Sequence, residues 1–308
     1  MDKDQNELQF LGFLGVYRET SKIILKWRKI FAQITLALIL PPLCIIFLAY
    51  SLISHQLCYK ILDLEITLNA WKDEPEYRKL SRMLEKEWVA LWLVTLGYFI
   101  FLLISSLLST SAVVYTVACN YDAKQITFKK IVSIVPRMWR RLMVTFLWCF
   151  TLFCVYTVVT VGLLIASLVS MQFLVAPALG IAMGVILSIF FAVGFVYIIM
   201  IWKLASTISV LEDVYGKKAM VKSKGLIKGN MGLLVWCSLG VSVSIVLVQA
   251  FFESLVLLDW VPIGVKIGVG LICLLLLSKV MLIDLVVQTV IYFVCKSYHH
   301  EIIDSSLW

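Results

Sequence analysis

The stretch Val210–Asn230 reads V-L-E-D-V-Y-G-K-K-A-M-V-K-S-K-G-L-I-K-G-N, and the interpretation of the whole chain starts from it. It is basic, its apolar residues recur at helical spacing, and a long apolar run lies on each side of it. Long apolar runs joined by lysine-rich connections are typical of helices that cross a membrane and of connections that stay in the cytosol. The stretch therefore predicts an integral membrane protein.

Composition supports the same class. Of the 308 residues, 62% are hydrophobic and only 15% are charged, whereas soluble domains average roughly 45–50% apolar and about 25% charged residues. A soluble chain of this length has too little interior to bury so much apolar surface. The formal net charge is +8, and the lysines and arginines fall between the apolar runs without any nucleic-acid-binding motif. The expected partners are therefore membrane lipids with anionic headgroups, and not nucleic acid.

Six apolar runs are long enough to span a bilayer as helices. The expected spans are roughly 30–54, 88–118, 142–169, 173–202, 231–258 and 264–295. The predicted fold class is all-α, a polytopic membrane protein with six transmembrane helices and with amphipathic helices on the cytosolic face. Pro41-Pro42 predicts a kink in the first span, and Pro136 predicts that 122–141 forms two short helices.

The distribution of basic residues predicts the orientation. The N-terminal segment and the connections 122–141 and 212–230 are rich in lysine and arginine, whereas the turns 170–172 and 259–262 contain neither. The 55–87 loop contains basic residues that acidic residues match. By the positive-inside rule both termini face the cytosol, in the endoplasmic reticulum or the plasma membrane.

The chain forms a single membrane domain, 1–308, which can be divided into three similar units of a basic helix followed by a hairpin. The units would cover 7–118, 122–203 and 213–296. Because each unit has an even number of spans, all three would enter the membrane from the same side. Ordinary basic cytosolic loops would produce the same pattern, so both interpretations stay open.

Ten basic residues are candidates for contact with a lipid headgroup or another anion, although positive-inside topology also accounts for them. They are Lys129, Lys130, Arg137, Arg140, Arg141, Lys217, Lys218, Lys222, Lys224 and Lys228. Three ionisable residues within the apolar runs are intramembrane candidates: Glu253, Lys279 and Asp284. Counted along their helices they lie toward the interfaces, so a structural role is expected, with transport or binding as the alternative. A spacing of five places Lys279 and Asp284 on different helix faces.

No pattern of catalytic, cofactor-binding or metal-ligating residues is found in the sequence. The three histidines, His55, His299 and His300, have no partner at metal-ligand spacing, and the eight cysteines include no C-x-x-C. No phosphate-binding loop or nucleophile motif is present. We therefore expect no cofactor, and an enzyme is not favoured.

Three stretches resemble a family of uncharacterised plant multi-pass transmembrane proteins: F-L-G-F-L-G-V-Y-R-E-T near the N-terminus, L-E-D-V-Y-G-K-K-A-M-V-K-S-K-G-L-I-K-G-N, and Q-T-V-I-Y-F-V-C-K-S-Y-H-H-E. More distantly, A-M-V-K-S-K-G-L-I-K-G-N is similar to the membrane domain of some bacterial glycerophosphodiester phosphodiesterases. The soluble barrel that carries their chemistry does not fit into this chain. The resemblance implies a fold and no activity.

The leading functional hypothesis is a protein without catalytic activity that interacts with lipid, or assists a partner, through its basic cytosolic face. Two alternatives stay open. A small-solute or lipid transporter is suggested by Lys279, Asp284, Pro41-Pro42 and the repeated units. A membrane enzyme acting on a lipid-borne substrate would require acidic or histidine side chains to converge at the cytosolic interface.

Overall fold

The computed structural model describes residues 12–49, 60, 62–63, 66, 77–121, 127–171, 177–256 and 262–299. This part of the chain is 94% helical and contains no strand. Six helices in it are long and apolar enough to cross a membrane; these candidate spans are 28–45, 81–121, 138–167, 182–211, 231–252 and 264–298. The predictions of an all-α fold and of a multi-pass integral membrane protein are confirmed.

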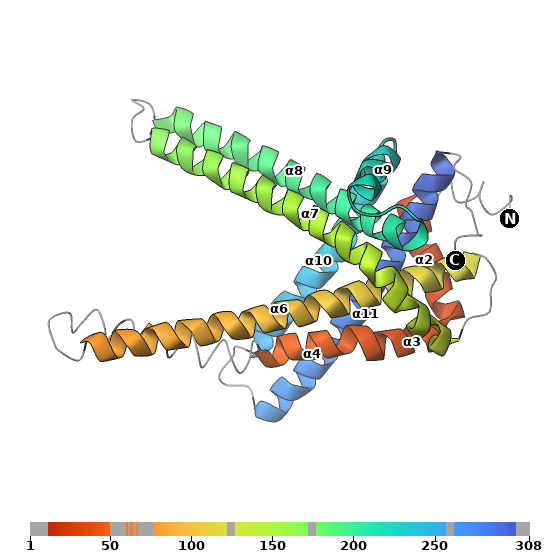
Figure 1. Ribbon diagram of the computed structural model, residues 1–308, viewed down its shortest axis with the longest axis horizontal. Helices are drawn as coiled ribbons and strands as arrows, with labels where there is room; N and C mark the ends of the chain where they lie inside the picture. Colours follow the sequence, from red (N-terminus) through yellow and green to blue (C-terminus); the bar gives the residue numbers. More distant parts are fainter. Residues whose placement is uncertain are drawn as a thin grey trace. The chain divides into compact units, whose positions relative to one another are not determined.

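Figure 1 shows the helices coloured in their order along the chain. Their bounds are α2 (Phe13–Lys26), α3 (Arg28–Ile34), the π-helix η1 (Thr35–Ile39), α4 (Leu40–Ala49), α6 (Tyr77–Tyr121), α7 (Phe128–Met171), α8 (Pro177–Leu211), α9 (Lys217–Ile227), α10 (Met231–Val256) and α11 (Ile263–Tyr298). Several exceed the ~20 residues that a membrane span requires. The longest helices therefore continue beyond one bilayer thickness.

The two prolines of the first span coincide with a change in helix type. Pro41 and Pro42 follow Leu40, the residue that caps η1 and whose N–H bonds to the carbonyl of Thr35, five residues back. A proline ring clashes with the carbonyl four residues before it, and those two carbonyls belong to Ala37 and Leu38 inside the wider π turn. The irregularity predicted from Pro41-Pro42 is thus a π-helical turn.

The prediction that Pro136 divides 122–141 into two short helices is wrong. Residues 128–171 form the single helix α7, with Pro136 inside it. The proline removes one hydrogen bond, but Ile131, Val135 and Leu142 before and after it are at most 5% exposed. Packing of this apolar stripe holds both halves in one helix and outweighs the local cost of the proline.

The chain divides into two compact units. Unit 1 comprises the described parts of Met1–Phe31, Thr110–Leu247 and Val280–Trp308, and unit 2 those of Ala32–Ser109 and Val248–Lys279. The three units predicted from the sequence, 7–118, 122–203 and 213–296, stay a prediction. Every site described below lies within unit 1.

The core of unit 1 surrounds the C-terminal part of α11. Val286, Val290, Tyr292 and Cys295 have no exposed surface. Helix α11 has 36 residues, ~54 Å at 1.5 Å per residue, which is longer than the ~30 Å hydrocarbon core. The excess length is packed against protein.

The paired helices α7 and α8 lie side by side (Figure 1), and the Tyr156 hydroxyl donates to the Phe191 carbonyl at 3.0 Å. Both helices expose large apolar side chains: Val158 of α7 and Phe190 of α8 are each 72% exposed. By contrast, the C-terminal part of α8 buries polar residues such as Thr207 and Ser209. Exposed apolar surface suits lipid, and buried hydroxyl groups suit a protein interior.

Candidate functional site

The turn between α8 and α9 is fastened to α7 by hydrogen bonds. Gly216, with φ of 65°, turns the chain into α9, and its N–H donates to Thr145 Oγ1 at 2.7 Å. Thr145 Oγ1 also lies 2.7 Å from Ser209 Oγ on α8. A positive φ is readily adopted only by glycine among common residues. This turn fixes where α9 begins.

Glu212, the first residue after α8, is the centre of a buried ionic cluster. Its carboxylate accepts from Lys222 of α9 at 2.7 Å, from Lys296 of α11 at 2.9 Å and from the Tyr292 hydroxyl at 2.7 Å. The side chains of Glu212 and Lys296 are each 6% exposed. Charged groups taken out of water need this degree of compensation. The cluster joins α8, α9 and α11.

The cluster predicts a pH dependence of stability. Burial raises the pKa of Glu212, but hydrogen bonds from Lys222, Lys296 and Tyr292 and the charge of Lys296 together lower that pKa below its ordinary 4.5. A lowered folded pKa stabilises the protein above about pH 4.5, and this contribution is lost as pH falls through the folded pKa. We expect the melting temperature in detergent to decrease when the pH is lowered below about 4.5. Glu212→Gln should flatten that part of the profile, and an unchanged profile would contradict the role of Glu212.

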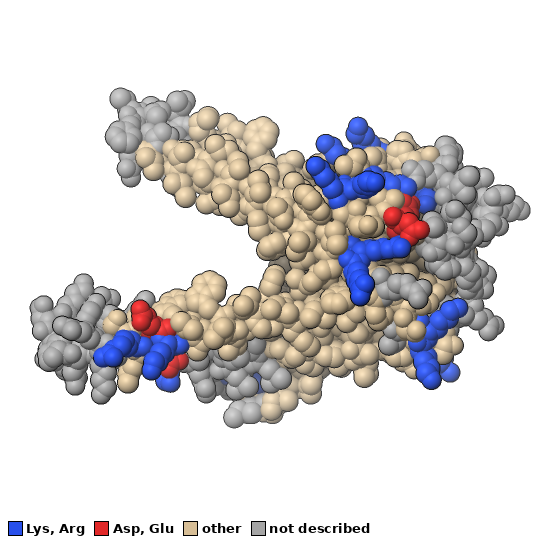
Figure 2. Space-filling model, in the orientation of Figure 1, with Lys and Arg blue, Asp and Glu red and all other residues tan. Residues whose placement is uncertain are grey.

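Helix α9 presents different residues on its different faces. Ala219, Ser223, Leu226 and Ile227 are buried against the bundle. Four lysines on and directly after α9 are exposed: Lys217, Lys218, Lys224 and Lys228. None of these four takes part in the ion pairs found among the described residues. Figure 2 shows the resulting concentration of positive charge over α9.

A groove of about 770 Å³ lies where α9 crosses α7 and α8. Its walls are mostly apolar and include Trp148 and Val155 of α7 and Ile198 of α8. Helix α9 contributes the i, i+3, i+4, i+7 stripe of Lys217, Met220, Val221 and Lys224. The Lys217 ammonium lies 5.9 Å from the centroid of the Trp148 ring, within cation–π range. Lysines thus lie at both ends of an apolar stripe.

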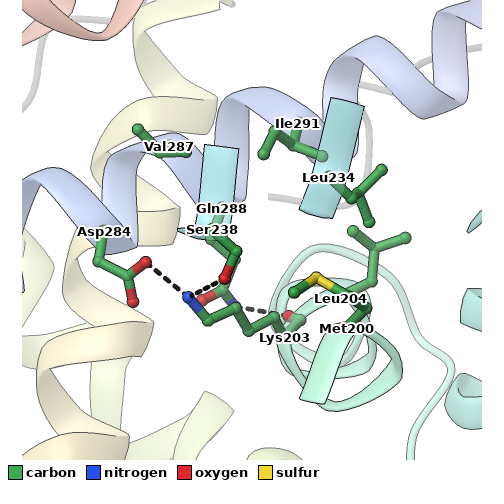
Figure 3. A pocket seen from close by; sticks show the side chains of 9 residues that line it. All are labelled: Met200, Lys203, Leu204, Leu234, Ser238, Asp284, Val287, Gln288 and Ile291. Carbon is green, nitrogen blue, oxygen red and sulfur yellow. Dashed lines mark hydrogen bonds and ion pairs between the residues drawn. The ribbon is translucent and has the colours of Figure 1, made fainter. Parts of the chain in front are cut away.

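A second ionic cluster joins α8, α10 and α11 (Figure 3). Lys203 Nζ lies 2.6 Å from Asp284 Oδ1 and 3.3 Å from Ser238 Oγ. Gln288 donates to the Lys203 carbonyl and to Thr207 Oγ1 at 2.5 and 3.0 Å. The adjoining cavity measures about 20 Å³, which is room for about one water molecule. The cluster therefore fits a role in joining helices.

The site residues predicted from the sequence divide into exposed side chains and side chains that form ion pairs. Lys129, Lys130, Arg140 and Arg141 are exposed on α7, and Arg141 forms an ion pair with Asp213 beside the start of α9. Lys217, Lys218, Lys224 and Lys228 are exposed, whereas Lys222 is directed to Glu212. Asp284 pairs with Lys203, and Lys279 is exposed on the same helix as Asp284. The side chains of Arg137 and Glu253 lie outside the described residues.

Sequence reasoning missed Lys203, Tyr292 and Lys296. Lys203 lies one residue beyond the predicted end of the fourth span at residue 202, yet α8 continues to Leu211. The sequence contains a signal for this continuation, because Leu204, Ile208 and Leu211 keep helical spacing and residues 204–211 contain no proline or glycine. Tyr292 and Lys296 are four residues apart, on one face of α11. Only their contact with Glu212 shows that this face is buried.

The side chains that could act as an acid or a base, Glu212, Asp284 and His299, contact different residues. Glu212 contacts Lys222, Asp284 contacts Lys203, and His299 Nε2 lies 3.1 Å from the carbonyl oxygen of Lys228. Within the described part of the chain, no three His, Cys, Asp or Glu side chains are grouped to hold a metal. His55 and His300 lie outside the described residues. The two clusters therefore pair the Glu212 and Asp284 carboxylates with lysines of neighbouring helices.

A family model described as a domain of unknown function (DUF8558) matches residues 1–308. No curated protein and no solved structure gives a significant match. The resemblance to plant multi-pass proteins and to the membrane domain of bacterial phosphodiesterases stays a prediction. Function is therefore inferred from the chemistry of the described residues alone.

Proposed function

The chain belongs to the DUF8558 family of unknown function, and we propose that it is a membrane protein that binds anionic lipids at a basic cytosolic face. The observation that carries the proposal is the position of α9. Its exposed Lys217 and Lys224 line a groove against residues 148–159 of α7 and 194–201 of α8. Basic residues near an anionic leaflet contribute about 1 kcal/mol each to attraction.

The charge and burial pattern supports a position for the membrane surface. The apolar, exposed parts of α7 and α8 would lie in lipid, and the protein-buried polar ends of α8 and α11 would form a cap above it. Lys203 and Asp284 would then lie near the boundary, where α9 crosses. We propose that this cap faces the cytosol, because the basic connections belong to it. The membrane would be that of the endoplasmic reticulum or the plasma membrane.

Fixed geometry distinguishes this face from an ordinary basic loop. The ion pairs of Glu212 with Lys222 and Lys296 tie α9 to α8 and α11, and the Gly216 hydrogen bond ties its start to α7. A helix held in place presents its lysines without first losing conformational entropy on binding. Helix α9 therefore presents its lysines to anionic groups in a fixed arrangement.

The observation in favour of a transporter is the Lys203–Asp284 cluster within two candidate spans. Its cavity of about 20 Å³ has the size of one water molecule, far below the roughly 300–1,000 Å³ of small-molecule sites. An enzyme would require accessible acid–base groups, and Glu212 is occupied by three donors. Lipid binding therefore remains the function that the geometry favours.

Thermal unfolding of the full chain in mixed micelles tests the proposal. We expect phosphatidylglycerol to raise the melting temperature by several degrees more than phosphatidylcholine, because a ligand that binds only the folded state stabilises it. Replacing Lys217, Lys218, Lys224 and Lys228 together with glutamine should remove most of the difference.

Salt provides the control for this measurement, because exposed charge interactions weaken as ionic strength rises. The excess in melting temperature with phosphatidylglycerol over phosphatidylcholine should therefore shrink as the salt concentration rises from about 0.05 to 0.5 M. The stabilisation by phosphatidylcholine should stay constant. Equal stabilisation by the two lipids in the unaltered protein would refute the proposed function.

A further inference from the structure

Building on the proposed function, we propose that the groove beneath α9 is a binding site for one anionic glycerophospholipid. Its phosphate would lie between Lys217 and Lys224, and one acyl chain would lie along α7 and α8. This assigns a single resident lipid to a defined place, beyond a general attraction between the basic face and the membrane.

The dimensions of the groove fit an acyl chain. Its α7 wall extends from Trp148 to Val159, which is ~16 Å at 1.5 Å per residue. This is about half of the ~30 Å hydrocarbon core and therefore the depth of one leaflet. The volume of about 770 Å³ lies within the roughly 300–1,000 Å³ of small-molecule sites.

The charges are placed for a headgroup. Lys217 and Lys224 are seven residues apart, two turns along one face of α9, or ~10 Å. Between them the same face contributes Met220 and Val221 to the groove. Two flexible ammonium groups can reach one phosphate from opposite sides, while the apolar residues between them contact the upper part of the acyl chain. The arrangement has positive charge at the mouth and apolar surface inside.

The same features favour a lipid over a water-soluble phosphate. Trp148, Val155 and Ile198 give the groove an apolar interior within candidate membrane spans. A soluble phosphate ester would leave this surface in contact with bilayer lipids and would gain nothing from it. An anionic lipid satisfies both the lysines and the apolar wall.

Native mass spectrometry of the full chain, released from detergent with phosphatidylglycerol or phosphatidylcholine of equal chain length, is the direct test. We expect one phosphatidylglycerol molecule to bind preferentially. Lys217→Gln with Lys224→Gln should weaken this binding about 30-fold, given two lysine contacts of about tenfold or less each. The matched control, Lys218→Gln with Lys228→Gln, removes the same charge from exposed lysines that do not line the groove and should bind within about threefold of the unaltered protein.

A second pair of variants tests the acyl-chain part without a change in charge. Val155 lines the groove, whereas Val158, also on α7 and 72% exposed, does not. Val155→Trp should fill the groove and abolish the single-lipid adduct, while Val158→Trp should keep it. Circular dichroism and melting of both variants check that they are folded. Single-chain lysophosphatidylglycerol should compete for the site, whereas glycerol phosphate should not.

The outcomes separate this site from the proposed function. If both pairs of lysine variants lose phosphatidylglycerol equally and Val155→Trp binds normally, the basic face binds lipid but the groove is not the site. If the unaltered protein does not distinguish the two lipids, both proposals fail. Competition by glycerol phosphate would replace the lipid with a soluble phosphate ligand and overturn the inference.

Discussion

Replacing Glu212 with alanine is expected to cost about 3–5 kcal/mol of the free energy of unfolding. The change leaves the Lys296 ammonium, 6% exposed, without its counter-charge in the interior of unit 1. It also removes the hydrogen bonds that Tyr292 of α11 and Lys222 of α9 donate to Glu212. An uncompensated buried charge is one of the few causes of so large an effect. Unfolding titrations in mixed micelles measure it.

The neighbouring residue provides a matched control. Asp213 also forms an ion pair, with Arg141, but its side chain is 63% exposed. Exposed pairs contribute about 0–1 kcal/mol, so Asp213→Ala should change stability by no more than that. Combining Glu212→Ala with Lys296→Met should recover part of the loss, because the buried charge is gone. Equal costs for Glu212→Ala and Asp213→Ala would contradict the buried cluster.

Replacing Lys203 with methionine is expected to cost about 2–3 kcal/mol of unfolding free energy. The Asp284 carboxylate, 18% exposed as a side chain, would lose its partner inside a candidate span. Asp284→Leu should cost a similar amount, since it leaves the Lys203 ammonium among apolar side chains such as Met200 and Val287 (Figure 3).

The double variant decides whether the two residues act as a pair. Lys203→Met with Asp284→Leu should cost at least about 1 kcal/mol less than the sum of the single changes, because contacting residues are coupled. Lys279→Met is the control: it removes a lysine that is exposed on the same helix, and it should cost less than about 0.5 kcal/mol. Strict additivity of the two single changes would show that the 2.6 Å contact does not contribute.

The most predictable part of the fold depended on local properties. A run of ~20 apolar residues crosses a bilayer as a helix in almost any context, because backbone groups in lipid must be bonded within the segment. All six expected spans correspond to such helices. The basic residues of 212–230 could also be located, and the structure leaves four of their lysines exposed. The π turn before Pro41-Pro42 was predictable only as an irregularity.

Predictions failed where contacts between distant segments outweighed local preference. Pro136 normally ends or kinks a helix, yet burial of Ile131 and Leu142 keeps α7 continuous. Lys203 marked the expected end of the fourth span, yet α8 continues because the cap buries its last turns. In both places tertiary burial outweighs the preference that one residue expresses locally.

Composition over short windows is enough to predict that the chain is helical, that it enters the membrane, and where positive charge lies along it. What each charged side chain contacts depends on how the helices pack. Lys203 meets Asp284 across 81 residues, and Lys296 meets Glu212 across 84. The groove beneath α9 likewise requires three helices to come together. Such contacts follow from packing, which no local spacing encodes.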